Sequence, residues 1–221
     1  MKKYYFLFSL VVLLSGSYSL YAQIKIKVAC VGNSITYGWG IVNRDSFSYP
    51  AQLQRLLGNK YEVKNFGVGG CTLLKKGDSP YWDQKEFEEV QEWIPDIVVV
   101  MLGTNDTKPY NWKYANDFGP NYAEFLNVFK KLPGRPKVWA TLPVPVFKDN
   151  YDITEKVLEL GISIIRKVAR QEDVPVINLF KALKPYGKNF FDGVHPDKLG
   201  AHYIAEGVYR KVRHYHLKIY N

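Results

Sequence analysis

Hydrophobic positions along the chain fall into two alternating patterns. Short apolar runs rich in β-branched residues alternate with longer segments in which apolar residues recur at helical spacing. The first pattern is typical of buried strands, and the second is typical of amphipathic helices. The short runs predict strands at residues 24–32, 61–67, 96–102, 137–144 and 175–180. The longer segments predict helices at residues 49–57, 84–93, 121–132, 153–171 and 197–212.

Strands that alternate with helices form crossover units, which build a parallel sheet with helices on both faces. The run IVVVML at residues 97–102 contains no polar residue, as is typical of a central strand buried on both sides. Neither an internal repeat nor a low-complexity linker interrupts the chain. The pattern therefore predicts one α/β domain with a three-layer α/β/α sandwich.

The first residues have the composition of a secretory leader. Lys2 and Lys3 precede the apolar run YYFLFSLVVLL, and SLYAQ then offers a cleavage site after Ala22. The large Leu20 three positions before the cut leaves its exact place open, and a retained leader is the alternative. The apolar run is too short to span a bilayer. We therefore expect a signal peptide at residues 1–22, a domain at residues 23–221 and a periplasmic or secreted product without stable membrane insertion.

The net charge does not alter the predicted class of protein. It is +9 formally and falls to +7 once Lys2 and Lys3 leave with the leader. The lysines are scattered and no arginine-rich run occurs, so the excess charge indicates a solvated surface and not a nucleic-acid interface. A weak attraction to acidic glycans is compatible with this charge.

The cysteines and histidines indicate no cofactor. Cys30 and Cys71 could meet only if the first two strands are neighbours, and a disulfide between adjacent core strands is geometrically disfavoured. His202, His214 and His216 lie on the last helix or after it, without a cluster of cysteines or carboxylates at ligand spacing. We therefore interpret these histidines as surface or packing residues and expect neither a metal nor a cofactor.

Glycines and short polar residues gather where three of the predicted strands end. Ser34 follows the first strand in the run GNS, Gly70 follows the second in GVGG, and Asn105 follows the third in GTND. Because ligands bind outside the carboxyl ends of parallel strands, we expect these residues to face one site. Ser34 has two interpretations at this point, as the cap of a helix or as a nucleophile.

The loop FFDGVHPD before the last predicted helix favours the nucleophile. A serine hydroxyl needs a base within hydrogen-bond reach, and a third group must orient that base. His195 and Asp192, three residues apart, supply these two roles. The backbone N–H groups of Ser34 and Gly70 and the side-chain amide of Asn105 offer donors for a developing oxyanion. We expect Asp106, beside Asn105, to be structural.

The blocks GNSIT, GVGG, GTND and DGVHPD, in this order and spacing, resemble the four blocks of the SGNH, or GDSL-like, hydrolase family over the whole mature chain. The family's Ser, Gly, Asn and His correspond to Ser34, Gly70, Asn105 and His195, with Asp192 three residues before the histidine. Asparagine replaces the aspartate of the family name before Ser34, at a position outside the triad. The motif G-x-S-x-G of α/β-hydrolases is absent at this serine. The resemblance implies a flavodoxin-like sheet of order 2-1-3-4-5 and ester hydrolysis through an acyl-enzyme on Ser34.

Two aromatic insertions, at residues 77–84 and 107–118, lie beside the edge that carries these blocks. Their side chains Trp82, Tyr110 and Trp112 can stack on sugar rings, or they can simply pack the loops. The segment GTNDTKPYNW also resembles bacterial sialate O-acetylesterases and related carbohydrate esterases. We therefore expect the substrate to be an ester, above all an O-acetyl group on a carbohydrate.

Other functions remain open at this stage. A lysophospholipase, a thioesterase or an aryl esterase would use the same triad, although lipid esters need a broad apolar cleft and these insertions are polar. A glycan-binding module that has lost turnover is disfavoured, because no catalytic role lacks a residue. An O-acyltransferase would need a donor site, of which the sequence gives no sign.

Overall fold

Five parallel strands form one sheet in the order β2-β1-β3-β4-β5, which confirms the predicted order. The computed structural model describes residues 25–214, so the predicted leader and His216 lie outside the described residues. The strands are β1 (Ile26–Gly32), β2 (Tyr61–Gly67), β3 (Ile97–Met101), β4 (Lys137–Leu142) and β5 (Val176–Asn178). All five residues of β3 are buried, because helices cover this central strand on both faces.

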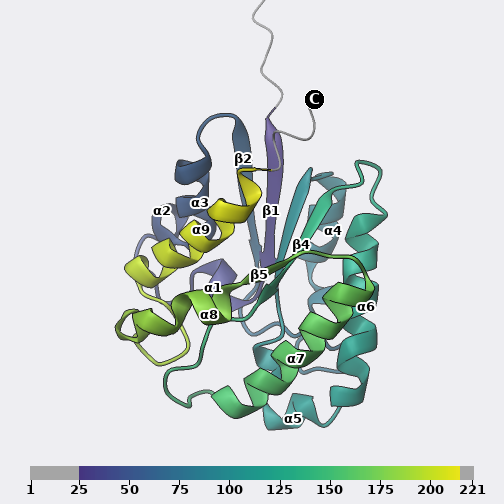
Figure 1. The fold of residues 1–221 in the computed structure, drawn as a ribbon, viewed down its shortest axis with the longest axis vertical. Coiled ribbons are helices and arrows are strands. Elements are labelled where there is room, and N and C mark those ends of the chain that lie inside the picture. Colours follow the sequence, from purple (N-terminus) through teal and green to yellow (C-terminus); the bar gives the residue numbers. More distant parts are fainter. Residues whose placement is uncertain (1–24, 215–221) are drawn as a thin grey trace, which may run out of the picture.

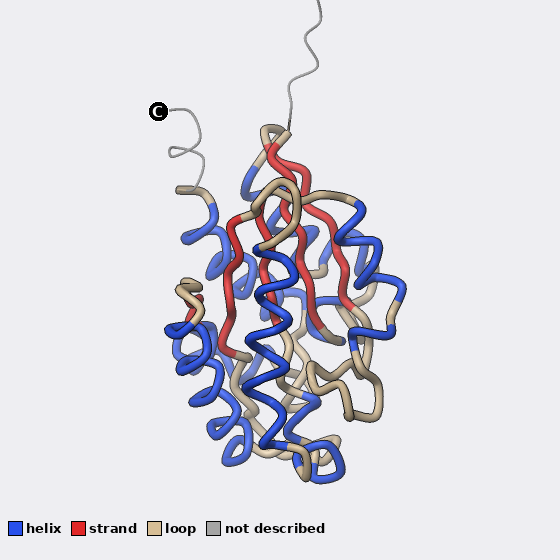
Figure 2. The backbone as a smooth tube through the Cα atoms, turned by 90° about the vertical axis from the view of Figure 1, so that its right-hand side faces the viewer, coloured by secondary structure: helices blue, strands red, loops and turns tan. Residues whose placement is uncertain are grey.

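Helices cover both faces of the sheet, so the predicted three-layer sandwich is confirmed (Figure 1). One layer consists of α1 (Ser34–Tyr37), α2 (Arg44–Phe47), α3 (Tyr49–Leu57), α8 (Leu179–Leu183) and α9 (Lys198–Val212). The other consists of α4 (Lys85–Glu92), α5 (Pro109–Trp112), α6 (Ala115–Lys130) and α7 (Glu155–Gln171). Figure 2 shows the strands running side by side between these helices. Side chains alternate along β1. Val28 and Cys30 belong to the hydrophobic core on the face covered by α3 and α9, and Ala29 and Val31 belong to the core on the face covered by α6 and α7.

Most predicted boundaries differ from the observed ones by one or two residues, and the start of one helix differs by six. Helix α6 begins at Ala115 and not at residue 121, because its first turn holds Phe118 against the core, fully buried like Tyr122 one turn later. Pro120 is tolerated inside this helix. The predicted fifth strand ends early, because the side chain of Asn178 accepts a hydrogen bond from the backbone N–H of Lys181 and caps α8.

The carboxyl ends of the strands point toward the lower edge of the sheet in Figure 1. The four-residue helices α1 and α5 follow strands at this edge, as does the 3-10 helix η2 (Asn105–Thr107). Such single turns are too short for a periodic pattern to reveal them in a sequence. None of the helices between residues 25 and 214 combines the length and the apolar character needed to cross a bilayer.

Candidate active site

Ser34 is the first residue of α1, directly beyond the end of β1. The capping role belongs to its neighbour, since Oδ1 of Asn33 accepts a hydrogen bond of 3.1 Å from the backbone N–H of Ile35. The hydroxyl of Ser34 is therefore not needed by the helix. Its Oγ lies 2.9 Å from Nε2 of His195, within reach for proton transfer.

Asp192 orients the imidazole from the other side. Its Oδ2 lies 2.7 Å from Nδ1 of His195, and its Oδ1 accepts the backbone N–H groups of Val194 and His195 at 2.9 and 2.7 Å. Partial burial alone would raise the pKa of this carboxyl, but the bonds from the backbone and ring of His195 and from Val194 outweigh it and lower the pKa. Asp192 is thus a carboxylate near neutral pH and holds the imidazole with Nε2 directed at Ser34.

Three groups around Ser34 can stabilise an oxyanion. Within residues 25–214, the backbone N–H groups of Ser34 and Gly70 donate to no protein acceptor. Gly70 has φ +80°, a conformation that favours glycine, and it lines the same cavity as Ser34. One N–H of the Asn105 side chain donates to the carbonyl of Cys71 at 3.0 Å, which fixes the amide and leaves its second N–H for substrate.

Buried hydrogen bonds lock the loops that carry these donors. Oδ2 and Oδ1 of Asp106 accept the backbone N–H groups of Leu73 and Leu74 at 3.1 and 2.7 Å. Burial raises the pKa of Asp106 to about 6, although these two hydrogen bonds act to lower it. Nδ2 of Asn111 donates to the carbonyl of Asn105 at 3.0 Å. The structural role expected for Asp106 is confirmed, since its carboxyl holds the loop after Gly70 against the loop of Asn105.

The two cysteines are both free and buried, so they form no disulfide with each other. Burial raises the pKa of Cys71 to about 11 and that of Cys30 to about 12. Both thiols therefore stay protonated near neutral pH, and only a thiolate is a strong nucleophile. Cys71 lies next to the oxyanion donor Gly70, yet Ser34 is the group in position to attack a substrate.

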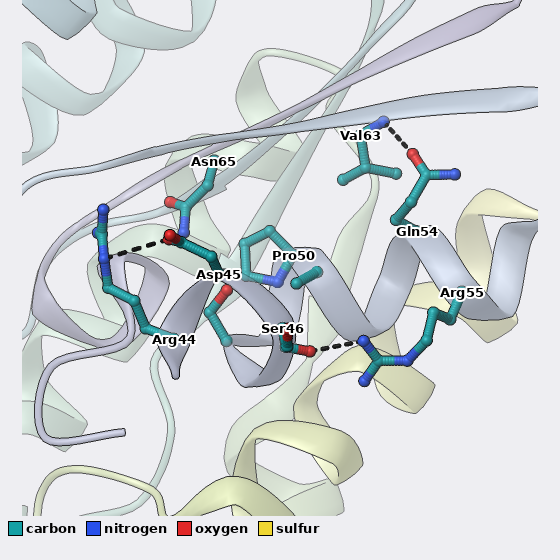
Figure 3. Close-up of a pocket in the computed structure, with 10 residues that line it drawn as sticks. Arg44, Asp45, Ser46, Pro50, Gln54, Arg55, Val63 and Asn65 are labelled. Carbon is teal, nitrogen blue, oxygen red and sulfur yellow. Dashed lines mark hydrogen bonds and ion pairs between the residues drawn. The ribbon is translucent and has the colours of Figure 1, made fainter. Parts of the chain in front are cut away.

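A cavity of about 250 Å³ opens over the triad, and Ser34, Gly70, Asn105 and His195 all line it. A larger hollow of about 530 Å³ lies between α2, α3 and β2 (Figure 3). Arg44 and Asp45 form an ion pair there, and none of the triad residues lines it. The cavity over the triad is therefore the one in which the expected chemistry can take place.

Residues 30–203 match the model of the GDSL-like Lipase/Acylhydrolase family. This match spans most of the chain and includes Ser34, Asp192 and His195. The chain belongs to this family. An acetylxylan esterase from Xylanibacter ruminicola is 38% identical to it over 200 residues, which are 82% of this chain and 42% of that protein. The chain thus spans less than half the length of this curated relative.

Solved structures share the fold of this GDSL-like protein. The aryl esterase of M. smegmatis superposes with a TM-score of 0.70 at 19% identity, over 86% of this chain and 99% of that one. Est24, a carbohydrate acetylesterase from Sinorhizobium meliloti, gives a TM-score of 0.68 at 20% identity, over 86% of this chain and 100% of that one. At such low identities, the likeness establishes the SGNH hydrolase architecture and leaves the substrate open.

The structure does not bring the three aromatic residues singled out in the sequence to the cavity of this GDSL-like protein. The indole N–H of Trp82 donates to the carbonyl of Leu73 at 2.7 Å, and its ring packs against Phe125. The ring of Trp112 packs against Phe118 with centroids 5.6 Å apart. Tyr110 is 44% exposed, and none of the three lines the cavity. Trp82 and Trp112 fit the alternative that they pack the insertions.

Other aromatic rings surround His195 instead, and sequence reasoning missed them. Trp39 lies with its ring centroid 4.5 Å from that of His195, and Tyr151 lies at 5.3 Å. The hydroxyl of Tyr151 donates to Oδ2 of Asp192 at 3.1 Å. Trp39 and Phe191 are close in sequence to Ser34 and Asp192, which could have indicated them, whereas Tyr151 lies in a segment without any motif.

His202 has a packing role, as expected, because its Nδ1 lies 3.1 Å from Oε1 of Gln52 on the neighbouring α3. Its Nε2 lies 3.5 Å from Glu206 on the same helix. Among residues 25–214, no three histidines, cysteines or carboxylates come together as a metal site would require.

Proposed function

We propose that the protein is a serine esterase that removes O-acetyl groups from carbohydrate, with acetylated xylan as the first substrate class to test. The observation that carries the proposal is the continuous hydrogen-bonded relay from Ser34 through His195 to Asp192 at the floor of a cavity. The name of the acetylxylan esterase relative supports the carbohydrate ester. The sialate resemblance of the segment after Asn105 keeps O-acetylated sialic acid as the second substrate to test.

The residues account for both halves of the reaction. Oγ of Ser34 attacks the ester carbonyl while Nε2 of His195 takes its proton, and Gly70 and Asn105 donate to the oxyanion. The intermediate collapses to an acyl-enzyme, and the sugar oxygen leaves with the proton from His195. A water molecule then attacks the acyl carbonyl and gives a proton to His195. Carboxylic acid leaves, and Ser34 recovers its proton.

The size of the cavity favours a small acyl group. Its volume of about 250 Å³ falls below the usual range of roughly 300–1,000 Å³ for sites that enclose a drug-sized ligand. Such a space holds an acetyl group with room to spare, so that the start of the alcohol part of the ester can lie in it as well. A lysophospholipase, by contrast, needs room for a long acyl chain.

The site of action is also a proposal. The leader-like composition of residues 1–22 supports export, so that the enzyme would meet glycans in the periplasm or outside the cell. N-terminal sequencing of the protein from fractionated cells tests this, and we expect the mature chain to begin near residue 23.

A panel of substrates tests the proposed reaction. Acetate release should be measured on acetylated xylan, on O-acetylated sialic acid and on aryl esters of increasing chain length. We expect release from acetylated glycans, and we expect kcat/KM on aryl esters to fall from acetate to butyrate and beyond. A kcat/KM that rises from acetate to octanoate would instead indicate a lipase or a thioesterase.

The variant Ser34→Ala tests the nucleophile. We expect kcat to fall on the order of 10⁶-fold, as in other serine triads, because no other described side chain replaces Oγ beside Nε2 of His195. The melting temperature should change little, because Asn33 and not Ser34 caps α1. Retention of more than about a tenth of the activity on p-nitrophenyl acetate would overturn the assignment.

A further inference from the structure

Three exposed aromatic rings gather on one side of His195. Trp39 is 43% exposed, Tyr151 is 42% exposed and Phe191 is 53% exposed, although each is a large apolar side chain. Trp39 stacks on Phe191 with centroids 6.0 Å apart and planes at 21°. The ring of Tyr151 meets that of Trp39 edge-on with centroids 6.1 Å apart. We call these three rings the aromatic platform.

The backbone adopts unfavourable conformations to hold Tyr151 in place. Asn150 and Ile153 pair across a two-residue turn in which Tyr151 and Asp152 have φ +53° and +59°. A type I′ turn requires such values, and they are strained for residues other than glycine. Nδ2 of Asn150 also donates to the carbonyl of Asp192 at 3.0 Å, which ties this turn to the catalytic loop. Strain of this kind is typical of functional sites.

The ring of Phe191 occupies the space that a side chain at Gly40 would fill. Gly40 has φ +75°, and a Cβ built on it would lie 2.5 Å from Cζ of Phe191. Only glycine therefore lets the phenyl ring lie against the segment that follows α1, where it stacks on Trp39. Two segments far apart in the sequence are thus shaped around a pair of nearly parallel, exposed rings.

The aromatic platform lies beside the cavity that contains Ser34, and this position indicates which part of a substrate it would contact. Large apolar rings that remain exposed together mark a binding surface, because folding gains little from them there. Trp39 and Tyr151 also line the catalytic cavity, so the platform continues directly from the place of the ester. When the ester carbonyl lies beside Oγ of Ser34, the rest of the substrate extends along the residues that line the cavity, Trp39 and Tyr151 among them. The C–H faces of a sugar ring are flat enough to stack on such rings.

We propose that the aromatic platform binds sugar residues of the acetylated glycan, next to the residue whose ester is cleaved. This inference rests on the proposed function. It places the sugar on the side of His195 and Asp192, whereas the sequence suggested the insertions that carry Trp82, Tyr110 and Trp112.

Leucine variants test the platform, because leucine keeps an apolar side chain and removes the flat ring. We expect Trp39→Leu and Phe191→Leu to lower the ratio of kcat/KM on acetylated xylotetraose to kcat/KM on p-nitrophenyl acetate about tenfold. The ratio cancels any effect on the chemical step that both substrates share. Tyr110→Leu is the matched control, since Tyr110 is as exposed as Trp39 and does not line the cavity. It should leave the ratio unchanged.

Binding measured without turnover separates this inference from the proposed function. In the Ser34→Ala background, calorimetric titration with acetylated xylotetraose should give a Kd about tenfold weaker once Phe191→Leu is added. If the unmodified enzyme releases no acetate from any acetylated glycan, the proposed function fails, and this titration still decides the platform. Unchanged Kd and ratio in Trp39→Leu and Phe191→Leu would overturn the inference, as would a loss confined to Tyr110→Leu. If Ser34→Ala binds no xylotetraose at all, the inference also fails.

Discussion

The two walls of the catalytic cavity are built in opposite ways. The wall that carries the proposed oxyanion donors, which we call the buried wall, is held by hydrogen bonds. Asn105 on it is only 5% exposed, and Ser34 and Gly70 are half-buried. The wall beside His195, which we call the open wall, carries Trp39 and Tyr151 of the aromatic platform, and they are 43% and 42% exposed. Donors that stabilise a developing charge must be fixed before the reaction, because reorganisation would cost their advantage. A surface that is proposed to bind a glycan must instead stay open to solvent. The difference separates the chemistry from the recognition of the substrate.

The largest effect is expected from the buried wall. Asn105→Ala should lower kcat by roughly 10²–10³-fold with little change in KM, because the amide interacts most strongly once charge develops on the carbonyl oxygen. Steady-state kinetics on p-nitrophenyl acetate measure this. A raised KM at unchanged kcat would make Asn105 a substrate-binding residue and would weaken the contrast between the walls.

A pair of glycine variants tests how tightly the buried wall is fixed. Gly70→Ala forces alanine into φ +80°, which costs about 1–2 kcal/mol, so the N–H should turn away and kcat should fall about tenfold. Gly69→Ala is the control, since Gly69 has no positive φ and a Cβ there meets nothing within 4 Å. Equal losses in both variants would mean that the added methyl group simply blocks the cavity.

The buried carboxyl of Asp106 should make the unfolding free energy of the protein depend on pH. Its pKa is raised to about 6 from an ordinary value of 3.8, so the folded protein takes up a proton between pH 7.5 and pH 5 that the unfolded chain does not. Wild-type stability should therefore increase on acidification, relative to Asp106→Asn, by about 1 kcal/mol. Urea unfolding of both proteins at these two pH values measures the difference. If acidification from pH 7.5 to pH 5 does not raise the unfolding free energy of the wild type relative to that of Asp106→Asn, the prediction is wrong.

The smallest effect is expected where the open wall touches the triad. Tyr151→Phe keeps the ring and removes the hydrogen bond to Oδ2 of Asp192. Asp192 retains the N–H groups of Val194 and His195 and the imidazole, so we expect kcat on p-nitrophenyl acetate to fall only about threefold. A loss beyond a hundredfold would show that the open wall takes part in the chemistry after all.

The two walls also differ in what the sequence revealed. Glycine and amide residues at strand ends are rare enough in combination that Gly70 and Asn105 stood out, and the parallel sheet placed them at one edge. Ser34 stood out at the end of the first strand, and Asp192 and His195 stood out because they lie three residues apart in one loop and can supply a base and the group that orients it. The strands and all five long helices followed from periodicity, except at the start of α6, where Pro120 concealed the first turn. The strand order followed from the family resemblance.

The aromatic platform could not be predicted in this way. Aromatic residues are common in cores as well as at sites, and their function depends on exposure, which the sequence does not encode locally. Trp82 and Trp112 stood in polar insertions beside the site and yet pack inward. Tyr151 reaches Asp192 only because an unusual turn of the backbone carries it there, and no residue pattern announced that turn.

The cap at Asn33 has a consequence for the electrostatics in front of the nucleophile. The turn after β1 needs only an acceptor oxygen at this position, which an aspartate would supply as well as the asparagine does. The family name and this chain therefore represent two solutions to one geometric demand, and they differ by a full negative charge at the start of α1. With asparagine, no acidic residue stands in the first turn of this four-residue helix. Position 33 is thus a place where the field at the reacting carbonyl can be adjusted without disturbing the triad.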